Sequence, residues 1–297
     1  MNTISEFELM LENVLNTLRK GGYTIHLVSY PEDRRSIDIV AKKEKDVVLI
    51  KVALDAEKIG NLEVEDLRKS SIAYSASSMI VAKTYKGREL EEDVVYVRGN
   101  INVVSPELLE KYIVRKEKPL IYNVKGIYVL KLDPQKFCER RTELNLSRGE
   151  LAEALGLTRK ALYLYEKGET MVSLNTALHL AEFLGEDIFK EIDPLKDKIN
   201  EEDFIIIHSE RERLDKELSS IISRYNYIGV RFKRTPVDIA LKGEKTTFSI
   251  VRQGDDSSSP RKIDDAEEIA NLTESLLIVL KEKTGLKELE KLIKKLE

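Results

Sequence analysis

The chain has 297 residues, enough for two or three domains with cores of their own. Hydrophobic residues make up 42% of it and charged residues 34%, and no run approaches the roughly 20 apolar residues that a membrane-spanning helix needs. The net charge of -4 excludes a surface covered in positive charge, so any binding of nucleic acid has to come from a local basic patch.

Cysteine and histidine usage limits the chemistry further. The single cysteine, Cys138, excludes an intramolecular disulfide and a zinc site built from clustered cysteines, and the three histidines are too scattered to form a metal-binding motif. The N-terminus carries Glu6, Glu8 and Glu12 and lacks a basic segment followed by an apolar run, so we expect no secretory signal. We therefore expect a cytoplasmic protein without cofactor, metal or catalytic residues. The many Lys and Glu residues are typical of thermophiles.

The first 119 residues predict an α/β domain. Apolar residues at helical spacing indicate helices, and short runs rich in β-branched residues indicate strands. The expected elements are a helix over 7–18, strands over 23–28, 37–41 and 47–52, a helix over 64–74, strands over 78–82, 94–97 and 102–104, and a helix opened by Ser105 and Pro106. This order predicts a mixed open sheet with helices packed against it.

A second segment, 120–193, begins after Lys118-Pro119 and ends at Asp193-Pro194. Its first part predicts a hairpin that turns at Lys125-Gly126. Five short helices are expected to follow. Capping residues define their starts: Asp133 before Pro134, the capping box of Ser147 and Glu150, Thr158 before 159–167, and Ser173 before a helix that points Ala177, Leu178 and Leu184 inward. Gly156 provides a sharp turn and Gly168 ends the third helix.

The last segment, 194–297, repeats the order of elements of the first. Residues 38–45 align without a gap on residues 238–245, and five of the eight positions are identical. We expect a helix over 214–225, strands over 227–232 and 246–251, a flexible loop over 255–260, a further helix, an apolar strand over 276–280 and a C-terminal helix. The apolar pattern of 77–83 also resembles that of 275–281. A gene duplication explains these features better than chance similarity does.

The segment 137–192 resembles the phage-repressor (Cro-type) helix-turn-helix family along its whole length. The matching residues are Arg140-Arg141, Leu146-Ser147, Glu150-Leu151-Ala152, Leu155-Gly156-Leu157-Thr158, Tyr165-Glu166-Lys167-Gly168, Ala177-Leu178 and Leu184-Gly185. The resemblance implies a five-helix, lambda-repressor-like domain that binds double-stranded DNA. It also implies that 159–167 is the recognition helix, whose N-terminal turn enters the major groove.

The resemblance also assigns roles to individual side chains. Leu162 and Tyr165 fall on the inward face of the recognition helix. The candidates for base contacts are Arg159, Lys160 and Tyr163, which follow the cap Thr158. The candidates for phosphate contacts are Arg140, Arg141, Arg148 and Lys167, with Arg148 at a position where the family often has a glutamine. At Arg140 and Arg141 a solvated helix face is an equally good interpretation.

The flanking segments are similar to the PD-(D/E)XK nuclease fold. In that fold an Asp, together with an acid two residues before a Lys, binds a divalent metal. Asp38 and Lys51 match the Asp and the Lys, but Leu49 occupies the acidic position and cannot bind a cation that requires oxygen ligands. In the second copy Asp238 remains, while Ser249 and Val251 replace the acid and the lysine.

These departures predict a vestigial site at Asp38, Lys51 and Asp238. An acid from elsewhere, such as Glu12, Glu44 or Asp55, is the one route to an active first copy. Otherwise Asp38 is a turn-capping carboxylate and Lys51 a solvated lysine at a sheet edge.

The complete arrangement resembles a family of archaeal helix-turn-helix regulators. It implies two restriction-endonuclease-like α/β domains, 1–119 and 194–297, which flank a helix-turn-helix domain over 120–193. From this we expect a sequence-specific DNA-binding regulator that acts as a homodimer, because one module reads too few base pairs for good discrimination. A metal-dependent, structure-specific nuclease remains the alternative.

Overall fold

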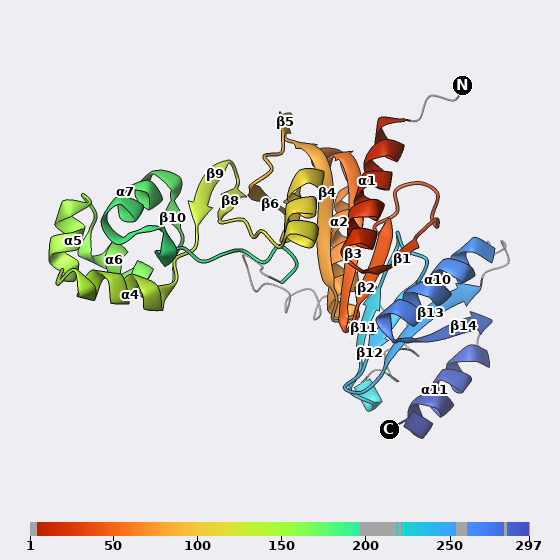
Figure 1. Cartoon of the computed structure of the whole chain (residues 1–297). Coiled ribbons are helices and arrows are strands. Elements are labelled where there is room, and N and C mark those ends of the chain that lie inside the picture. Colours follow the sequence, from red (N-terminus) through yellow and green to blue (C-terminus); the bar gives the residue numbers. More distant parts are fainter. Residues whose placement is uncertain are drawn as a thin grey trace.

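The structure, a computed structural model, describes residues 5–196, 218, 221, 223–253, 260–281 and 284–296. Two α/β domains pack against each other, and a small helical module stands away from them at one end (Figure 1). Among the described residues, no helix is both long and apolar enough to cross a membrane.

The first domain has the expected order of elements, with β5 and two short helical turns in addition. Its elements are α1 (Glu6–Lys20), β1 (Thr24–Leu27), β2 (Ile39–Lys43), β3 (Asp46–Asp55), η1 (Ala56–Lys58), α2 (Asn61–Ala73), β4 (Ser77–Tyr85), β5 (Arg88–Glu89), β6 (Val94–Arg98), β7 (Ile101–Val104), α3 (Pro106–Glu110) and η2 (Lys111–Arg115). The strands form a mixed sheet in the order β1-β2-β3-β4-β7-β6, in which β3, β4 and β7 are parallel.

Each face of this sheet buries its own hydrophobic cluster, because side chains alternate along a strand. On one face Ile39 and Ile50 pack with Val14 and Leu18 of α1. On the other face Val40 and Leu49 pack with Leu67 of α2 and with residues of the second domain. Both faces are therefore covered, which explains why the central strands are apolar at nearly every position.

The predicted hairpin consists of β8 (Ile121–Val124) and β9 (Ile127–Leu130), and it joins the sheet to the helical module. Its turn residues Lys125 and Gly126 both have positive φ angles, 55° and 92°. On one side β8 pairs in parallel with β6, and on the other side β9 pairs with the two-residue strand β10 (Val172–Ser173) of the module. The sheet therefore runs without interruption from the first domain into the module.

The module contains four α-helices: α4 (Pro134–Glu143), α5 (Arg148–Ala154), α6 (Arg159–Lys167) and α7 (Leu174–Leu184). The place of the fifth expected helix is taken by the 3-10 turn η3 (Glu186–Ile188). The capping residues are where the sequence predicts them: in the capping box, for example, the Glu150 amide donates to Ser147 Oγ at 3.2 Å. Leu178 is an exception to the predicted inward face, because its side chain is 57% exposed while Ala177 and Leu184 are buried.

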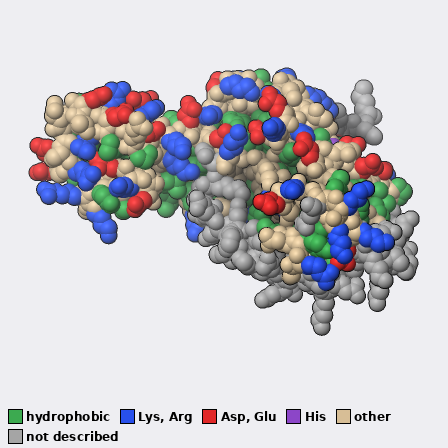
Figure 2. All heavy atoms as spheres, turned by 90° about the horizontal axis from the view of Figure 1, so that it is seen from below, with side chains coloured by type: hydrophobic (Ala, Val, Ile, Leu, Met, Phe, Trp, Pro, Cys, Tyr) green, Lys and Arg blue, Asp and Glu red, His purple; other side chains and the backbone are tan. Residues whose placement is uncertain are grey.

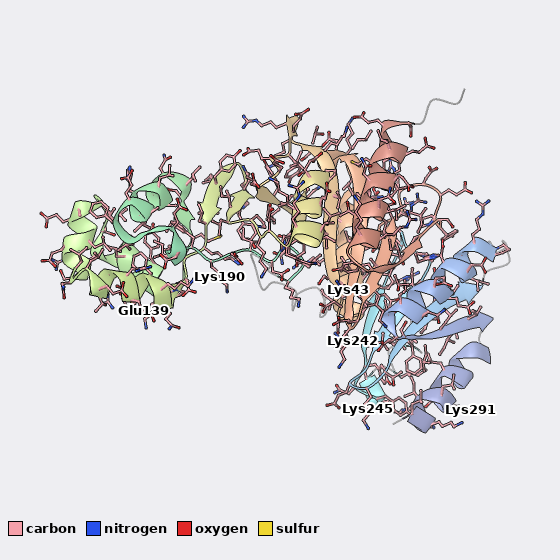
Figure 3. The ribbon with its side chains drawn as sticks, in the orientation of Figure 1. Lys43, Glu139, Lys190, Lys242, Lys245 and Lys291 are labelled. Carbon is pink, nitrogen blue, oxygen red and sulfur yellow. The ribbon has the colours of Figure 1, made fainter. Side chains whose placement is uncertain are left out.

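Two chain segments hold the module on the first domain. The hairpin enters it, and the segment after η3 returns beside the hairpin, where the Lys190 amide donates to the carbonyl of Lys131 at 2.9 Å. Lys190 marks this neck in Figure 3. Farther on, Ile192 is buried in the first domain, and Asp193 accepts a hydrogen bond of 2.7 Å from the Tyr112 hydroxyl. With two connections the module has less freedom to rotate than it would have on a single linker.

The second domain repeats the first, as the sequence predicts. Its described elements are β11 (Ile228–Arg231), β12 (Ile239–Lys242), β13 (Thr247–Gln253), α10 (Pro260–Thr273), β14 (Leu276–Lys281) and α11 (Thr284–Leu296). The order β11-β12-β13-β14 matches β1-β2-β3-β4, and its last pair is parallel as well. The predicted helix 214–225 lies largely outside the described residues, and so does most of the predicted loop 255–260.

Strand pairing corrects one detail of the internal alignment. Val40 faces Leu49 and Ala240 faces Ser249, which confirms the alignment of the second and third strands. In the last strand, however, Val48 faces Ser77 whereas Phe248 faces Leu276. The sequence alignment of 77–83 with 275–281 is therefore shifted by one residue, because an apolar run carries no signal that fixes its register.

The two α/β domains contact each other reciprocally. Asp66 of α2 accepts 2.7 Å hydrogen bonds from the amides of Lys233 and Arg234, in the loop after β11. Asp265 of α10 accepts hydrogen bonds of 2.8 and 2.7 Å from the amides of Ser29 and Tyr30, in the loop after β1.

A lysine near the end of the second strand of each domain makes a second reciprocal contact. Lys42 reaches Glu274, just after α10, at 2.6 Å, and Lys242 reaches the Ile72 carbonyl in α2 at 2.9 Å. Figure 3 shows Lys242 where the domains meet. The two copies thus pack as an internal dimer with an approximate two-fold relation.

Candidate nucleic-acid interface and vestigial nuclease site

The helix α6, which the sequence predicts to be the recognition helix, has the two expected faces. Its cap Thr158 accepts a hydrogen bond from the Ala161 amide at 3.1 Å, and Gly168 ends it in the left-handed conformation. Leu162 is buried in the core of the module, whereas Arg159 and Lys160 are exposed. The guanidinium of Arg159 lies across Gly149 of α5, where an added Cβ atom would come within 3.1 Å of Nη2.

A buried carboxylate on the inner side of α6 ties three helices together. Glu166 binds Arg141 of α4 at 2.6 Å through one oxygen and the Nε of Arg148 of α5 through the other. Arg141 also donates to the Leu146 carbonyl at 2.6 Å. This arrangement fixes α6 relative to α4 and α5. It also shows that the guanidinium of Arg141 is occupied within the module.

The other predicted phosphate contacts differ in how free they are. Arg140 binds Asp187 at 2.9 Å and Glu143 at 3.0 Å, and these hydrogen bonds raise its pKa. Arg148 keeps about half of its side chain exposed, and its guanidinium lies 5.5 Å from the centre of the Tyr163 ring. The Lys167 ammonium lies 5.9 Å from the same ring. Tyr163 therefore brings two exposed cations of α5 and α6 together.

The distribution of charge in the module makes the surface of α5 and α6 the best candidate for contact with DNA. Residues 133–193 contain eight Lys and Arg but twelve Asp and Glu, so the module as a whole is acidic. Four of the eight cations belong to α5 and α6: Arg148, Arg159, Lys160 and Lys167. On the side of the molecule that Figure 2 shows, the basic and acidic side chains of the described residues are interspersed and form no continuous basic surface. Electrostatic attraction to DNA is consequently local.

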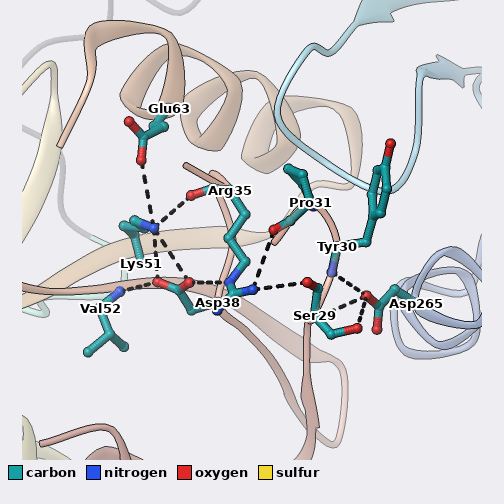
Figure 4. Close-up of polar contacts among 9 residues, drawn as sticks. All are labelled: Ser29, Tyr30, Pro31, Arg35, Asp38, Lys51, Val52, Glu63 and Asp265. Carbon is teal, nitrogen blue, oxygen red and sulfur yellow. Dashed lines mark hydrogen bonds and ion pairs between the residues drawn. The ribbon is translucent and has the colours of Figure 1, made fainter. Parts of the chain in front are cut away.

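The predicted vestigial site in the first domain is a compact ion-pair network (Figure 4). Asp38 accepts hydrogen bonds of 2.7 Å from Arg35 Nε and from the Val52 amide, one on each oxygen. Lys51 Nζ lies 3.2 Å from Asp38 and donates to the Arg35 carbonyl at 2.7 Å. Lys51 is buried, so the interpretation as a solvated lysine at a sheet edge is wrong. Leu49 is fully buried and packs in the shared core, as an apolar replacement of the acid requires.

The acid nearest to this pair is one that the sequence reasoning missed. Glu63 of α2 lies 3.8 Å from Lys51 Nζ and accepts a hydrogen bond of 2.7 Å from the Gly60 amide. Of the predicted substitutes, Asp55 lines the pocket next to the network, but Glu12 binds Arg19 on α1 and Glu44 lies in the turn between β2 and β3. A glutamate three residues into a helix usually caps it, so the sequence carried no signal of this second role.

The donor set does not fit a divalent cation. The Lys51 ammonium lies within 4 Å of the carboxylates of both Asp38 and Glu63. It therefore occupies the space in which these two acids would bind a cation, and Leu49 supplies no oxygen ligand. Within the described part of the chain, no group of three or more His, Cys, Asp or Glu residues has a geometry that could hold a metal ion. We therefore derive no metal-dependent step from these residues.

The second copy retains a lysine next to its aspartate, but from a different element. Arg252 donates its amide to Asp238 at 2.7 Å, as Val52 does to Asp38. Val251 replaces the strand lysine as predicted, yet Lys262 of α10 reaches both oxygens of Asp238, at 2.8 and 2.7 Å. The strand thus lacks the lysine as expected, but a lysine from a helix takes its place in space.

Comparisons with known proteins agree with both parts of this description. A family model described as a PD-(D/E)XK superfamily domain matches residues 7–119, and one described as helix-turn-helix matches residues 139–190. The chain thus combines a nuclease-like domain with a helix-turn-helix domain. No solved structure matches it significantly.

Several archaeal proteins match nearly the whole chain, and each is named "Putative HTH-type transcriptional regulatory protein". The one from Pyrococcus furiosus is 31% identical over 278 residues, 92% of this chain and 86% of the relative. Those from Saccharolobus islandicus and Saccharolobus solfataricus are 32% and 30% identical, each over 95% of this chain and 91% of the relative. The chain belongs to this family of archaeal HTH-type regulatory proteins.

Proposed function

We propose that this protein regulates transcription by binding a specific sequence in double-stranded DNA through α6. The observation that carries the proposal is the outer face of α6. Arg159 and Lys160 are exposed there at the start of a helix whose inner side is held by the Glu166 ion pairs. A helix that is fixed in this way can present its first turn to the major groove with little loss of side-chain and backbone freedom.

Contacts to the DNA backbone are assigned to Arg148 and Lys167, because both are exposed and flank the same tyrosine. Arg148 also binds Glu166, but through its Nε atom alone, whereas Arg140 and Arg141 each bind their partners through at least two nitrogens. Arg140 and Arg141 would have to leave their partners Asp187 and Glu166 to bind phosphate. We therefore expect them to contribute mainly to the structure of the module.

The test is the selection of binding sites from random duplex DNA with the full chain, followed by variants on the selected site. Arg159→Ala should lower the specific affinity by about 1–3 kcal/mol and relax the preference at one base pair. Arg148→Ala should weaken binding to all DNA sequences about equally, and the affinity should depend less on the salt concentration. Arg88→Ala, an exposed arginine on β5 of the first domain, serves as the control. If no sequence is enriched, or if Arg159→Ala binds like the control, the proposal fails.

We also propose that the protein acts as a homodimer on a site with two-fold symmetry. The surfaces with which the nuclease-like domains pair are already used within one chain, since α2 and α10 each contact the opposite domain. Large exposed apolar side chains remain on the helical module and the hairpin tip, among them Ile127 at 62% and Leu178 at 57% exposure. Light scattering after gel filtration tests this proposal: a monomeric mass together with a non-palindromic selected site would contradict it.

A metal-dependent nuclease is the second candidate, and the convergence of Asp38, Lys51 and Glu63 in one pocket favours it. We propose that the protein is not an enzyme, on the grounds that Leu49 provides no ligand and that Lys51 occupies the space between the acids. Incubation with duplex, single-stranded and branched DNA in Mg²⁺ or Mn²⁺ distinguishes the two candidates. Cleavage that disappears in both Asp38→Ala and Glu63→Ala would establish the nuclease.

A further inference from the structure

A pocket of about 500 Å³ lies beside the Asp38–Lys51 pair in the first domain. Its walls come from the start of α1, the loop after β1, the end of β3, η1 and the start of α2. This volume is in the range of about 300–1,000 Å³ that is usual for small-molecule sites. Arg35, Asp38, Lys51 and Glu63, which Figure 4 shows in contact with one another, line this pocket.

The acidic side chains of the pocket already have partners. Asp38 is held by Arg35, Lys51 and the Val52 amide, and Glu63 accepts from the Gly60 amide. The remaining two are Asp55, which accepts from the Glu57 amide at 2.9 Å, and Glu32, which binds Arg261 at 3.0 Å. None of these carboxylates needs a ligand to complete its interactions.

Two basic side chains of the same pocket differ from the acids in this respect. Arg34 and Lys58 are exposed at its walls, and neither has an ion-pair or hydrogen-bond partner within the described part of the chain. Both side chains are therefore available to a ligand.

We propose that this pocket binds a small phosphate ester of the size of a nucleoside monophosphate. Arg34 and Lys58 bind the phosphate, since guanidinium and ammonium groups are the side chains best suited to phosphate oxygens. The apolar wall of Phe7, Leu54 and Ile59 receives the base. Lys51 and Arg35 keep their present partners and fix the floor of the pocket.

The surroundings of the corresponding Asp238–Lys262 pair in the second domain are different. The Lys262 ammonium, which takes the role of Lys51 there, lies 5.7 Å from the centre of the Tyr30 ring of the first domain. An aromatic ring thus lies next to the second Asp–Lys pair, whereas Arg34 and Lys58 line the pocket next to the first. We therefore expect one ligand per chain.

Calorimetric titration of the full chain in a buffer without phosphate tests the proposal, with AMP, adenosine and inorganic phosphate as separate probes. AMP should bind saturably with one site per chain, and adenosine should bind at least about tenfold more weakly, because one charge-assisted hydrogen bond corresponds to roughly a factor of ten or more. Arg34→Ala and Lys58→Ala should each weaken AMP binding by about tenfold or more. Arg88→Ala is the matched control and should leave it unchanged.

Two further measurements show whether the phosphate belongs to a free nucleotide or to a DNA end, and whether the variants are folded. A 5′-phosphorylated duplex of unrelated sequence should not compete with AMP, and competition at equal concentration would assign the pocket to a DNA end instead. Both variants should melt at the temperature of the wild type, since the two side chains are exposed and have no partner to lose.

The proposal is overturned if AMP gives no saturable heat at millimolar concentration, or if adenosine binds as well as AMP. It is also overturned if Arg34→Ala and Lys58→Ala bind AMP like the control. Binding of AMP does not depend on the assigned role of α6. A failure here and a failure of the DNA selection are therefore separate results.

Discussion

The carboxylate of Asp265 offers a direct test of the internal dimer. It accepts hydrogen bonds from the amides of Ser29 and Tyr30 in the other domain, from the Ser29 hydroxyl at 2.9 Å, and contacts His26 at 2.8 Å. Asp265→Ala removes this acceptor and leaves two partly buried backbone donors without a partner. Asp265→Asn keeps one oxygen and loses the charge.

The loss of stability follows from the number of hydrogen-bond donors that each variant leaves without an acceptor. An unsatisfied buried donor costs about 1–3 kcal/mol, so Asp265→Ala should lower the free energy of unfolding by roughly 2–6 kcal/mol. Asp265→Asn should cost about 1–2 kcal/mol, the difference between a charged and a neutral acceptor. Asp264→Ala is the control, because this neighbour on α10 is exposed; it should stay within about 0.5 kcal/mol of the wild type.

The pH dependence should differ between Asp265 and Asp66. Burial raises the pKa of Asp265, but the hydrogen bonds from His26, Ser29 and Tyr30 outweigh it and place the pKa below its ordinary value of 3.8. Asp265 therefore contributes its full stabilisation of the fold at pH values above 3.8, and this stabilisation is lost as the pH falls through the lowered pKa. Burial raises the pKa of Asp66 despite two amide hydrogen bonds. The folded protein then favours protonated Asp66, and this contribution is lost as the pH rises through the raised pKa.

Urea denaturation followed by circular dichroism, at pH 7 and at steps down to about pH 3, measures both effects. Acidification should weaken the wild type through Asp265, and Asp265→Ala should remove that part of the pH dependence. Asp66→Asn should be tolerated at pH 7 better than Asp265→Asn is, since it removes a charge whose burial is unfavourable. If Asp265→Ala is as stable as Asp264→Ala at pH 7, the reciprocal contacts do not hold the domains together.

Two substitutions separate structure from recognition in the helical module. Arg141→Ala should destabilise the module by about 1–3 kcal/mol, because it removes one of the two arginines that bind the buried Glu166, whereas a residue that only binds phosphate would leave the melting temperature unchanged. Gly149→Ala should weaken specific DNA binding by about 1 kcal/mol without a loss of stability, since its new Cβ atom would displace the guanidinium of Arg159 while alanine favours the helix. Calorimetric melting and fluorescence anisotropy on the selected site check both, and equal affinities of Gly149→Ala and the wild type would contradict the second.

Local sequence signals were sufficient for the elements and their ends. Ser147, Thr158 and Gly168 act at the helix ends where the sequence places them, because caps and turns depend on a few neighbouring residues. The repeat of 38–45 in 238–245 identified two copies of one fold, and the apolar residue at 49 indicated a buried position. The two faces of α6 also follow from sequence spacing, since helical periodicity alone separates Leu162 from Arg159.

Only the tertiary structure decided which distant side chains meet. Nothing in the sequence places Glu63 near Lys51, Lys262 on Asp238, or Glu166 between Arg141 and Arg148, because each pair joins elements whose relative position depends on packing. Nor does the sequence show that Asp66 and Asp265 each accept hydrogen bonds from backbone amides of the opposite domain. Periodicity reports which face of an element is buried, whereas the partner on that face is set by how the elements pack around a common core.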